Sequence, residues 1–78
     1  MKKAISNPAH RRMCARLRGY RESAALSQAA LAAALGKPQS FVSSYEAGNR
    51  RLDLVELDQI CDALGIDLLD LVQEFKRG

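Results

Sequence analysis

The side chains that most often carry out catalytic chemistry are scarce in this 78-residue chain. It has one histidine, His10, and two cysteines, Cys14 and Cys61, whose spacing matches neither a zinc site nor a redox pair. No carboxylate pair, metal-ligand cluster or glycine-rich phosphate loop is recognisable in the sequence. The sequence therefore predicts a protein that is not an enzyme and has no metal or cofactor, with both thiols as core filler.

Basic side chains are plentiful, and they are unevenly distributed. Residues 1–51 hold ten basic and two acidic residues, a net charge of +8, whereas residues 52–78 hold two basic and seven acidic residues, a net charge of −5. A basic part of this kind is typical of a surface that meets a polyanion. Charge alone leaves open that these arginines and lysines lie on solvated helix faces.

The elements that must position these residues are expected to be helices, because β-branched residues are scarce and no stretch alternates for long with period two. The pattern predicts helices at residues 9–23, 28–35 and 38–47, a fourth opened by Asp53 and ended by Gly65, and a fifth capped by Asp67 that runs through Phe75. Residues 1–8 are expected to form a loose arm, and residues 9–78 one compact all-α domain, a five-helix bundle.

The apolar residues of three predicted helices recur at helical spacing and are expected to face the core. In the first helix they are Met13, Leu17, Tyr20 and Ala24; in the fourth Leu57, Ile60, Cys61 and Leu64; in the fifth Leu68, Leu71, Val72 and Phe75.

Residues 26–48 carry a more specific pattern. Ala32 is a small residue at which two helices can touch, and Gly36 is suited to the turn between them. The inward apolar positions are filled by Leu31, Leu35, Val42 and Tyr45, and a Glu-x-Gly-x-Arg stretch follows at residues 46–50. This pattern resembles the Cro/repressor-type (xenobiotic-response-element, XRE) helix-turn-helix family over about residues 11–72, with Lys37 and Pro38 as a local departure. The resemblance implies a lambda-repressor-like DNA-binding fold.

In a helix-turn-helix the second helix enters the major groove and the first crosses the DNA backbone. The resemblance thus implies base contacts, since glutamine can pair with adenine, serine with several bases and phenylalanine with a thymine methyl group. The expected base contacts are Gln39, Ser40, Phe41, Ser43 and Ser44. The expected phosphate contacts are Gln28, Lys37, Arg18, Arg21, Asn49, Arg50 and Arg51. Phe41 could instead pack against the preceding helix, and the two later serines could simply be solvated.

Two further expectations follow from the resemblance. Arg21 and Glu46 occupy the places of a family ion pair, which is expected to be partly buried and to orient Arg21 toward a phosphate. Val55 and Leu69 stand where the family is usually polar, which suggests a dimer interface, although isolated exposed apolar residues are common.

The resulting hypothesis is a small prokaryotic or phage-type transcriptional regulator, a repressor, that binds a palindromic operator in double-stranded DNA as a homodimer. It is expected to be cytoplasmic, nucleoid-associated when bound to DNA, without a membrane segment and without a small-molecule effector. The alternative is an antitoxin or a protein-interaction adaptor built on the same bundle.

Overall fold

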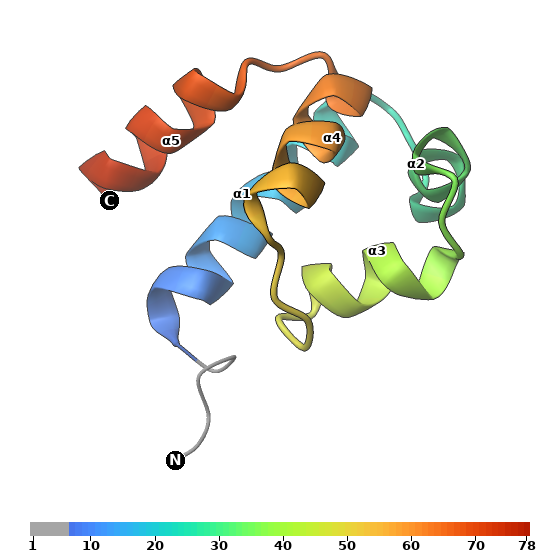
Figure 1. The fold of residues 1–78 in the computed structure, drawn as a ribbon, viewed down its shortest axis with the longest axis horizontal. Helices are drawn as coiled ribbons and strands as arrows, with labels where there is room; N and C mark the ends of the chain where they lie inside the picture. The colour runs from blue at the N-terminus through green and yellow to red at the C-terminus, as the bar shows by residue number, and fades with distance from the viewer. Residues whose placement is uncertain (1–6) are drawn as a thin grey trace.

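A computed structural model describes residues 7–78, which form five helices and no strand (Figure 1). The helices are α1 (Pro8–Ser23), α2 (Gln28–Leu35), α3 (Gln39–Glu46), α4 (Leu54–Leu64) and α5 (Leu68–Arg77). The predicted all-α class and five-helix bundle are confirmed. In this described part of the chain, no helix is long and apolar enough to cross a membrane.

Local capping interactions set most of the helix boundaries. The Ser27 hydroxyl accepts a hydrogen bond from the Ala30 N–H at 3.0 Å, and Gly36 ends α2 in the left-handed conformation with φ of 67°. Asp53 and Glu56 form a reciprocal capping box at the start of α4. The Asp67 carboxylate accepts from the Leu69 N–H at 2.8 Å and caps α5. All these caps were expected from the sequence.

Four boundaries differ from the expected ones, and one of them is the end of α3, which lies at Glu46 and not at residue 47. Helix α1 begins at Pro8 because Asn7 acts as its N-cap, its side chain accepting from the Ala9 N–H at 2.7 Å. Residues 1–6 of the expected arm lie outside the described residues. Pro38 has an extended backbone (ψ 155°) and is the N-cap of α3, not its first residue. Helix α5 continues to Arg77, since Lys76 and Arg77 interact favourably with the negative end of the helix dipole.

The core lies where the five helices converge, and each helix contributes to it. Its fully buried members include Leu17, Leu31, Val42, Tyr45, Ile60, Cys61 and Leu71. Val72, expected in the core, is 37% exposed because it follows Leu71 by about 100° around α5 and points away from the other helices. Ala24, also expected to face inward, is exposed because α1 has already ended at Ser23.

Burial of the two thiols gives a prediction about alkaline stability. Desolvation raises the pKa of Cys61 to about 11 and also raises the pKa of Cys14. Between pH 9 and 11 the unfolded chain therefore loses thiol protons that the folded chain keeps, so stability falls as the pH rises. Each thiol contributes a slope of at most about 1.4 kcal/mol per pH unit.

Urea unfolding followed from about pH 7.5 to 10.5 measures this loss, a window that begins below and ends above the ordinary thiol pKa. Cys61→Ala serves as the matched variant, because it removes one ionisable group and leaves the helices intact. Its stability is expected to fall less steeply with pH than that of the wild-type protein. Equal slopes would show that Cys61 ionises as readily in the folded chain as in the unfolded one.

Candidate nucleic-acid interface

Helices α2 and α3 pack against each other around a short turn, residues 36–38 (Figure 1). Ala32 is buried between them, as its small side chain predicted. The turn is closed by the Lys37 N–H, which donates to the Ala32 carbonyl at 2.9 Å. With Val42 and Tyr45 buried on its inner side, α3 has only one face left for a partner.

The accessible face of α3 is polar. Gln39 and Ser40 are exposed at its N-terminus, and Ser43 and Ser44 are half-buried one turn later. The Ser43 hydroxyl donates to the Ser40 carbonyl at 3.3 Å, so this side chain has a defined position. The structure thus places four of the five predicted base contacts at accessible positions of α3.

Phe41, the fifth, is half-buried and not free in solvent. Its ring and that of Tyr45 meet edge to face, with a centroid distance of 5.6 Å and an interplanar angle of 72°.

A chain of hydrogen bonds ties the start of α3 to the interior. Gln39 Nε2 donates to Gln28 Oε1 at 3.5 Å, and Gln28 Nε2 donates to Glu46 Oε1 at 3.0 Å. The first residues of α2 and α3 are thereby linked through side chains. Sequence reasoning assigned Gln28 only to a phosphate and missed its role as a support for Gln39, since nothing in the spacing shows which way an amide points.

The chain of hydrogen bonds ends at the expected ion pair. Arg21 Nε donates to Glu46 Oε2 at 2.7 Å and Arg21 Nη2 to Glu46 Oε1 at 3.0 Å, a two-point pairing. Arg21 Nη1 also donates to the Leu26 carbonyl at 2.7 Å. The hydrogen bonds to Glu46 raise the pKa of Arg21, which therefore stays charged.

The expected contact between Arg21 and a phosphate stays a prediction. Arg21 is only 8% exposed, and all three nitrogens of its guanidinium group already donate to protein oxygens. The orientation toward a phosphate was inferred from the family resemblance, and the low exposure of Arg21 leaves little of its side chain accessible to DNA.

Four of the other predicted phosphate contacts are exposed and flank α3. Lys37 lies in the turn before it, and Asn49, Arg50 and Arg51 lie in the loop after it. Arg50 is partly engaged, because its Nη2 pairs with Glu56 Oε2 at 2.5 Å. On the exposed side of α1, Arg18 pairs with Glu22 at 3.1 Å, so part of its charge is neutralised locally.

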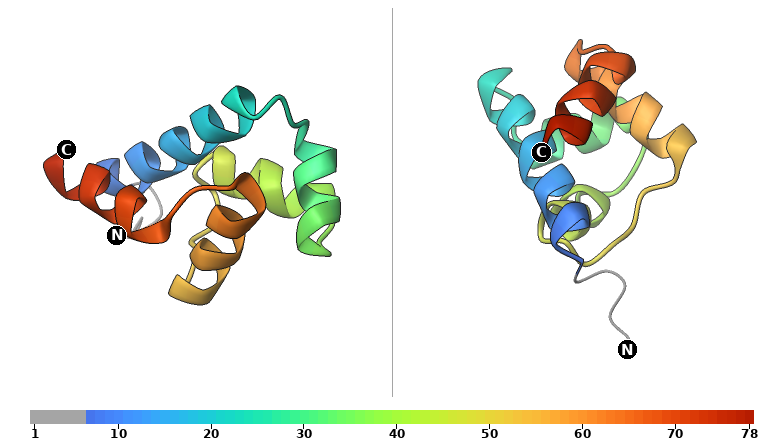
Figure 2. Two further views of the ribbon diagram at one scale, coloured as in Figure 1. Left: turned by 90° about the horizontal axis from the view of Figure 1, so that it is seen from above. Right: turned by 90° about the vertical axis from the view of Figure 1, so that its left-hand side faces the viewer.

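Apolar side chains are exposed on the two C-terminal helices. Val55 and Leu69 are 65% and 69% exposed, and Leu54 on α4 is exposed to a similar extent. Helix α5 lies at the opposite end of the molecule from α2 (Figures 1 and 2). These exposed apolar side chains and the polar face of α3 are carried by different helices.

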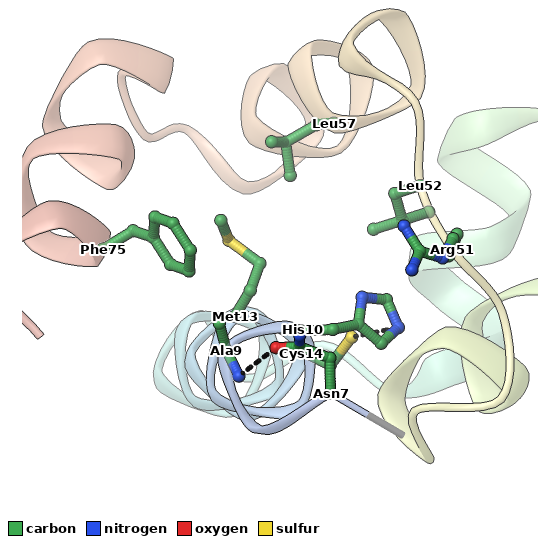
Figure 3. Close-up of a pocket in the computed structure, with 9 residues that line it drawn as sticks. All are labelled: Asn7, Ala9, His10, Met13, Cys14, Arg51, Leu52, Leu57 and Phe75. Carbon is green, nitrogen blue, oxygen red and sulfur yellow. Dashed lines mark hydrogen bonds between the residues drawn. The ribbon is translucent and has the colours of Figure 1, made fainter. Parts of the chain in front are cut away.

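A cavity of about 280 Å³ opens near the start of α1 (Figure 3). Met13, Leu57 and Phe75 form much of its apolar wall, and Arg51 lines it from the loop before α4. His10 also lines it, with its Nε2 3.6 Å from the Cys14 sulfur. None of the predicted base contacts lines this cavity, so it is separate from the accessible face of α3.

Comparisons with known proteins agree with this geometry. A family model described as "Helix-turn-helix domain" matches residues 12–75. The chain is 35% identical over 57 residues to Control protein C.MunI from Mycoplasma sp, a match that covers 73% of this chain and 77% of that protein.

Solved structures are similar too. One is an XRE-family like protein from Pseudomonas syringae pv. tomato str. DC3000, with a TM-score of 0.87 and 37% identity, covering 94% of this chain and 89% of the other. Another is the restriction-modification controller protein C.AhdI from Aeromonas hydrophila, with a TM-score of 0.78 and 32% identity, covering 83% of this chain and 98% of the other. From its fold, its sequence match and these relatives, the chain belongs to the XRE-type helix-turn-helix family of DNA-binding regulators.

Proposed function

We propose that this protein is a sequence-specific transcriptional repressor that reads the major groove of double-stranded DNA with α3. The observation that carries the proposal is the side-chain network behind Gln39, which is exposed at the start of α3 and tied through Gln28 to the buried pair of Arg21 and Glu46. A polar side chain held in this way at a helix terminus has lost part of its freedom before it meets a base. This arrangement suits direct readout, in which a glutamine pairs with the N6 and N7 atoms of adenine.

Ser40 and Ser43 are proposed to contact neighbouring bases, with Ser44 at the margin of the groove. A serine hydroxyl both donates and accepts hydrogen bonds and can therefore pair with several bases. These serines are expected to discriminate between bases less strongly than Gln39 does. The expected hierarchy is strong discrimination at one or two base pairs and weaker preferences beside them.

The phosphate contacts are proposed to come from both sides of α3. Lys37, Asn49, Arg50 and Arg51 are exposed there, and the first turn of α2 at Gln28 presents backbone N–H groups. Arg18 is a weaker contributor because Glu22 shares its charge. A protein of this kind acts where the DNA is, in the cytoplasm and at the nucleoid.

Replacing Arg51 by glutamine tests this electrostatic part. Loss of one phosphate contact is expected to lower the magnitude of the slope of log K against log salt by about 0.9 and to weaken binding to all duplexes alike. Fluorescence anisotropy on a duplex of random sequence, between about 50 and 200 mM salt, measures the slope. Arg77→Gln, a charge-matched change at the end of α5, should leave it unchanged. Equal slopes in the wild type and the Arg51 variant would show that Arg51 does not contact a phosphate.

The exposed apolar surface of α4 and α5 supports a homodimer. Two copies that bury Val55 and Leu69 against each other would be related by a two-fold axis, which matches a palindromic operator. Such burial would take from water two of the three most exposed large apolar side chains of the described chain.

Replacing Leu69 by aspartate tests the proposed dimer interface. Leu69→Asp places two like charges close to the two-fold axis and is expected to turn the dimer into a monomer in sedimentation experiments, with the fold unchanged because position 69 is exposed. Ala30→Asp, at an exposed position of α2 at the other end of the molecule from α5, is the control and should stay dimeric. A dimer that survives the Leu69 change would place the interface elsewhere.

Similarity to two control proteins, C.MunI and C.AhdI, supports a regulatory role in which the protein adjusts the expression of genes near its operator. A reporter gene placed behind the operator tests repression directly. Expression is expected to fall when the protein is present. Expression that rises instead would identify an activator, and unchanged expression would contradict a regulatory role at that site.

A further inference from the structure

Phe41 lies between two cations that come from opposite sides of α3. Lys37 Nζ is 5.4 Å from the centroid of its ring and Arg50 Cζ is 4.9 Å from it. Lys37 belongs to the turn before α3 and Arg50 to the loop after it. Both distances fall in the range in which the negative face of an aromatic ring attracts a cation.

The ring itself has a fixed position. Its edge contacts the ring of Tyr45, which is fully buried, and Phe41 packs against the hydrophobic core. Because the ring is half-buried and anchored, it keeps its position, and the side chains of Lys37 and Arg50 lie against it. Phe41 is therefore a fixed point to which two otherwise exposed cations are held.

Arg50 is held from a second direction. Its Nη2 donates to Glu56 Oε2, while Glu56 Oε1 accepts from the Asp53 N–H in the capping box of α4. The guanidinium group thus lies over the ring of Phe41 and pairs with Glu56. Because a guanidinium group has five N–H donors, the pairing with Glu56 leaves others for a phosphate oxygen.

We infer that Phe41 is a positioning residue that holds Lys37 and Arg50 as phosphate contacts at the two ends of α3, and that it does not read a base. This inference rests on the proposed DNA-binding function. It replaces the expected contact with a thymine methyl group, because two cations and the ring of Tyr45 already lie against the ring of Phe41. Side chains held in place lose less entropy on binding, so the ring improves affinity for every sequence alike.

Phe41→Leu keeps an apolar side chain and removes the aromatic ring. Its affinity is expected to fall about 3- to 10-fold, equally for a random duplex and for the selected operator, since the attraction of two cations is lost. Phe41→Tyr keeps the ring and is expected to bind like the wild type. Circular dichroism melting of both variants checks that they fold.

A double-mutant cycle then tests the coupling. If Phe41 acts through Arg50, Arg50→Gln weakens random-duplex binding less in the Phe41→Leu background than in the wild type. Additive effects would overturn the inference. A loss confined to the operator, which disappears when a thymine is replaced by uracil, would also overturn it and restore base contact.

A measurement without DNA separates this inference from the proposed function. Protons of Lys37 and Arg50 that lie over an aromatic ring are expected to show upfield NMR shifts in the wild type and in Phe41→Tyr, and to lose them in Phe41→Leu. Absence of these shifts in the wild type overturns the inference even if DNA binding is strong. Failure of the wild type to bind any duplex, with the shifts present, overturns the proposed function and with it the phosphate role of the two cations.

Discussion

Replacing Glu46 by alanine is expected to lower the free energy of unfolding by about 3–5 kcal/mol. The change strands the charge of Arg21, which is only 8% exposed and would lose two of its three hydrogen bonds at once. Gln28 would lose its acceptor as well. A domain of this size has a total stability on the order of 4–12 kcal/mol, so the variant should be close to unfolding.

Urea unfolding followed by circular dichroism measures the loss. Glu22→Ala is a matched control, since it removes a glutamate from another arginine pair whose carboxylate side chain is 56% exposed. An exposed pair of this kind contributes about 1 kcal/mol or less. If Glu46→Ala proved as mild as Glu22→Ala, the pair of Arg21 and Glu46 would not be the buried support of the interface.

The second large effect concerns specificity. Gln39→Ala is expected to lose about 1–3 kcal/mol of discrimination at one or two base pairs, while binding to random DNA stays nearly unchanged. The reason is that Gln39 is exposed at the start of α3 and carries no charge, so it contributes to base recognition and not to the electrostatic attraction. Titrations of the operator and of its singly substituted forms measure the loss.

Two further variants sharpen the test. Gln28→Ala removes the hydrogen-bonding partner of Gln39 and should reproduce part of the lost discrimination at the same base pair. Gln59→Ala, on the exposed side of α4, should have no effect. If Gln39→Ala weakened binding to operator and random DNA equally, another residue of α3 would have to recognise the bases.

Features governed by neighbouring residues could be predicted from the sequence. The cap of α2 by Ser27, its end at Gly36 and the capping box of Asp53 and Glu56 depend on side chains within a few positions of the backbone groups they satisfy. The pair of Arg21 and Glu46 joins residues of α1 and α3, and only the family resemblance suggested it. Its depth of burial, which leaves Arg21 only 8% exposed, depends on how the helices pack.

Most contacts between side chains of different helices and loops could not be predicted from the sequence. Lys37 meets Phe41 from the turn before α3, and Arg50 meets Phe41 and Glu56 from the loop between α3 and α4; residue spacing gives no signal for either contact. Val72 shows the limit of helical periodicity, since a pattern of apolar residues marks a broad face and only packing decides which edge of that face is covered.

Selection of binding sites from random duplex DNA by the purified protein, at about 0.15 M salt, tests the central claim most directly. The protein is predicted to enrich an inverted repeat whose half-site centres lie about one helical turn apart, as a two-fold dimer with α3 in the major groove requires. Weak, salt-sensitive binding with no enriched sequence would contradict sequence-specific recognition and would favour a protein-binding role for the same bundle.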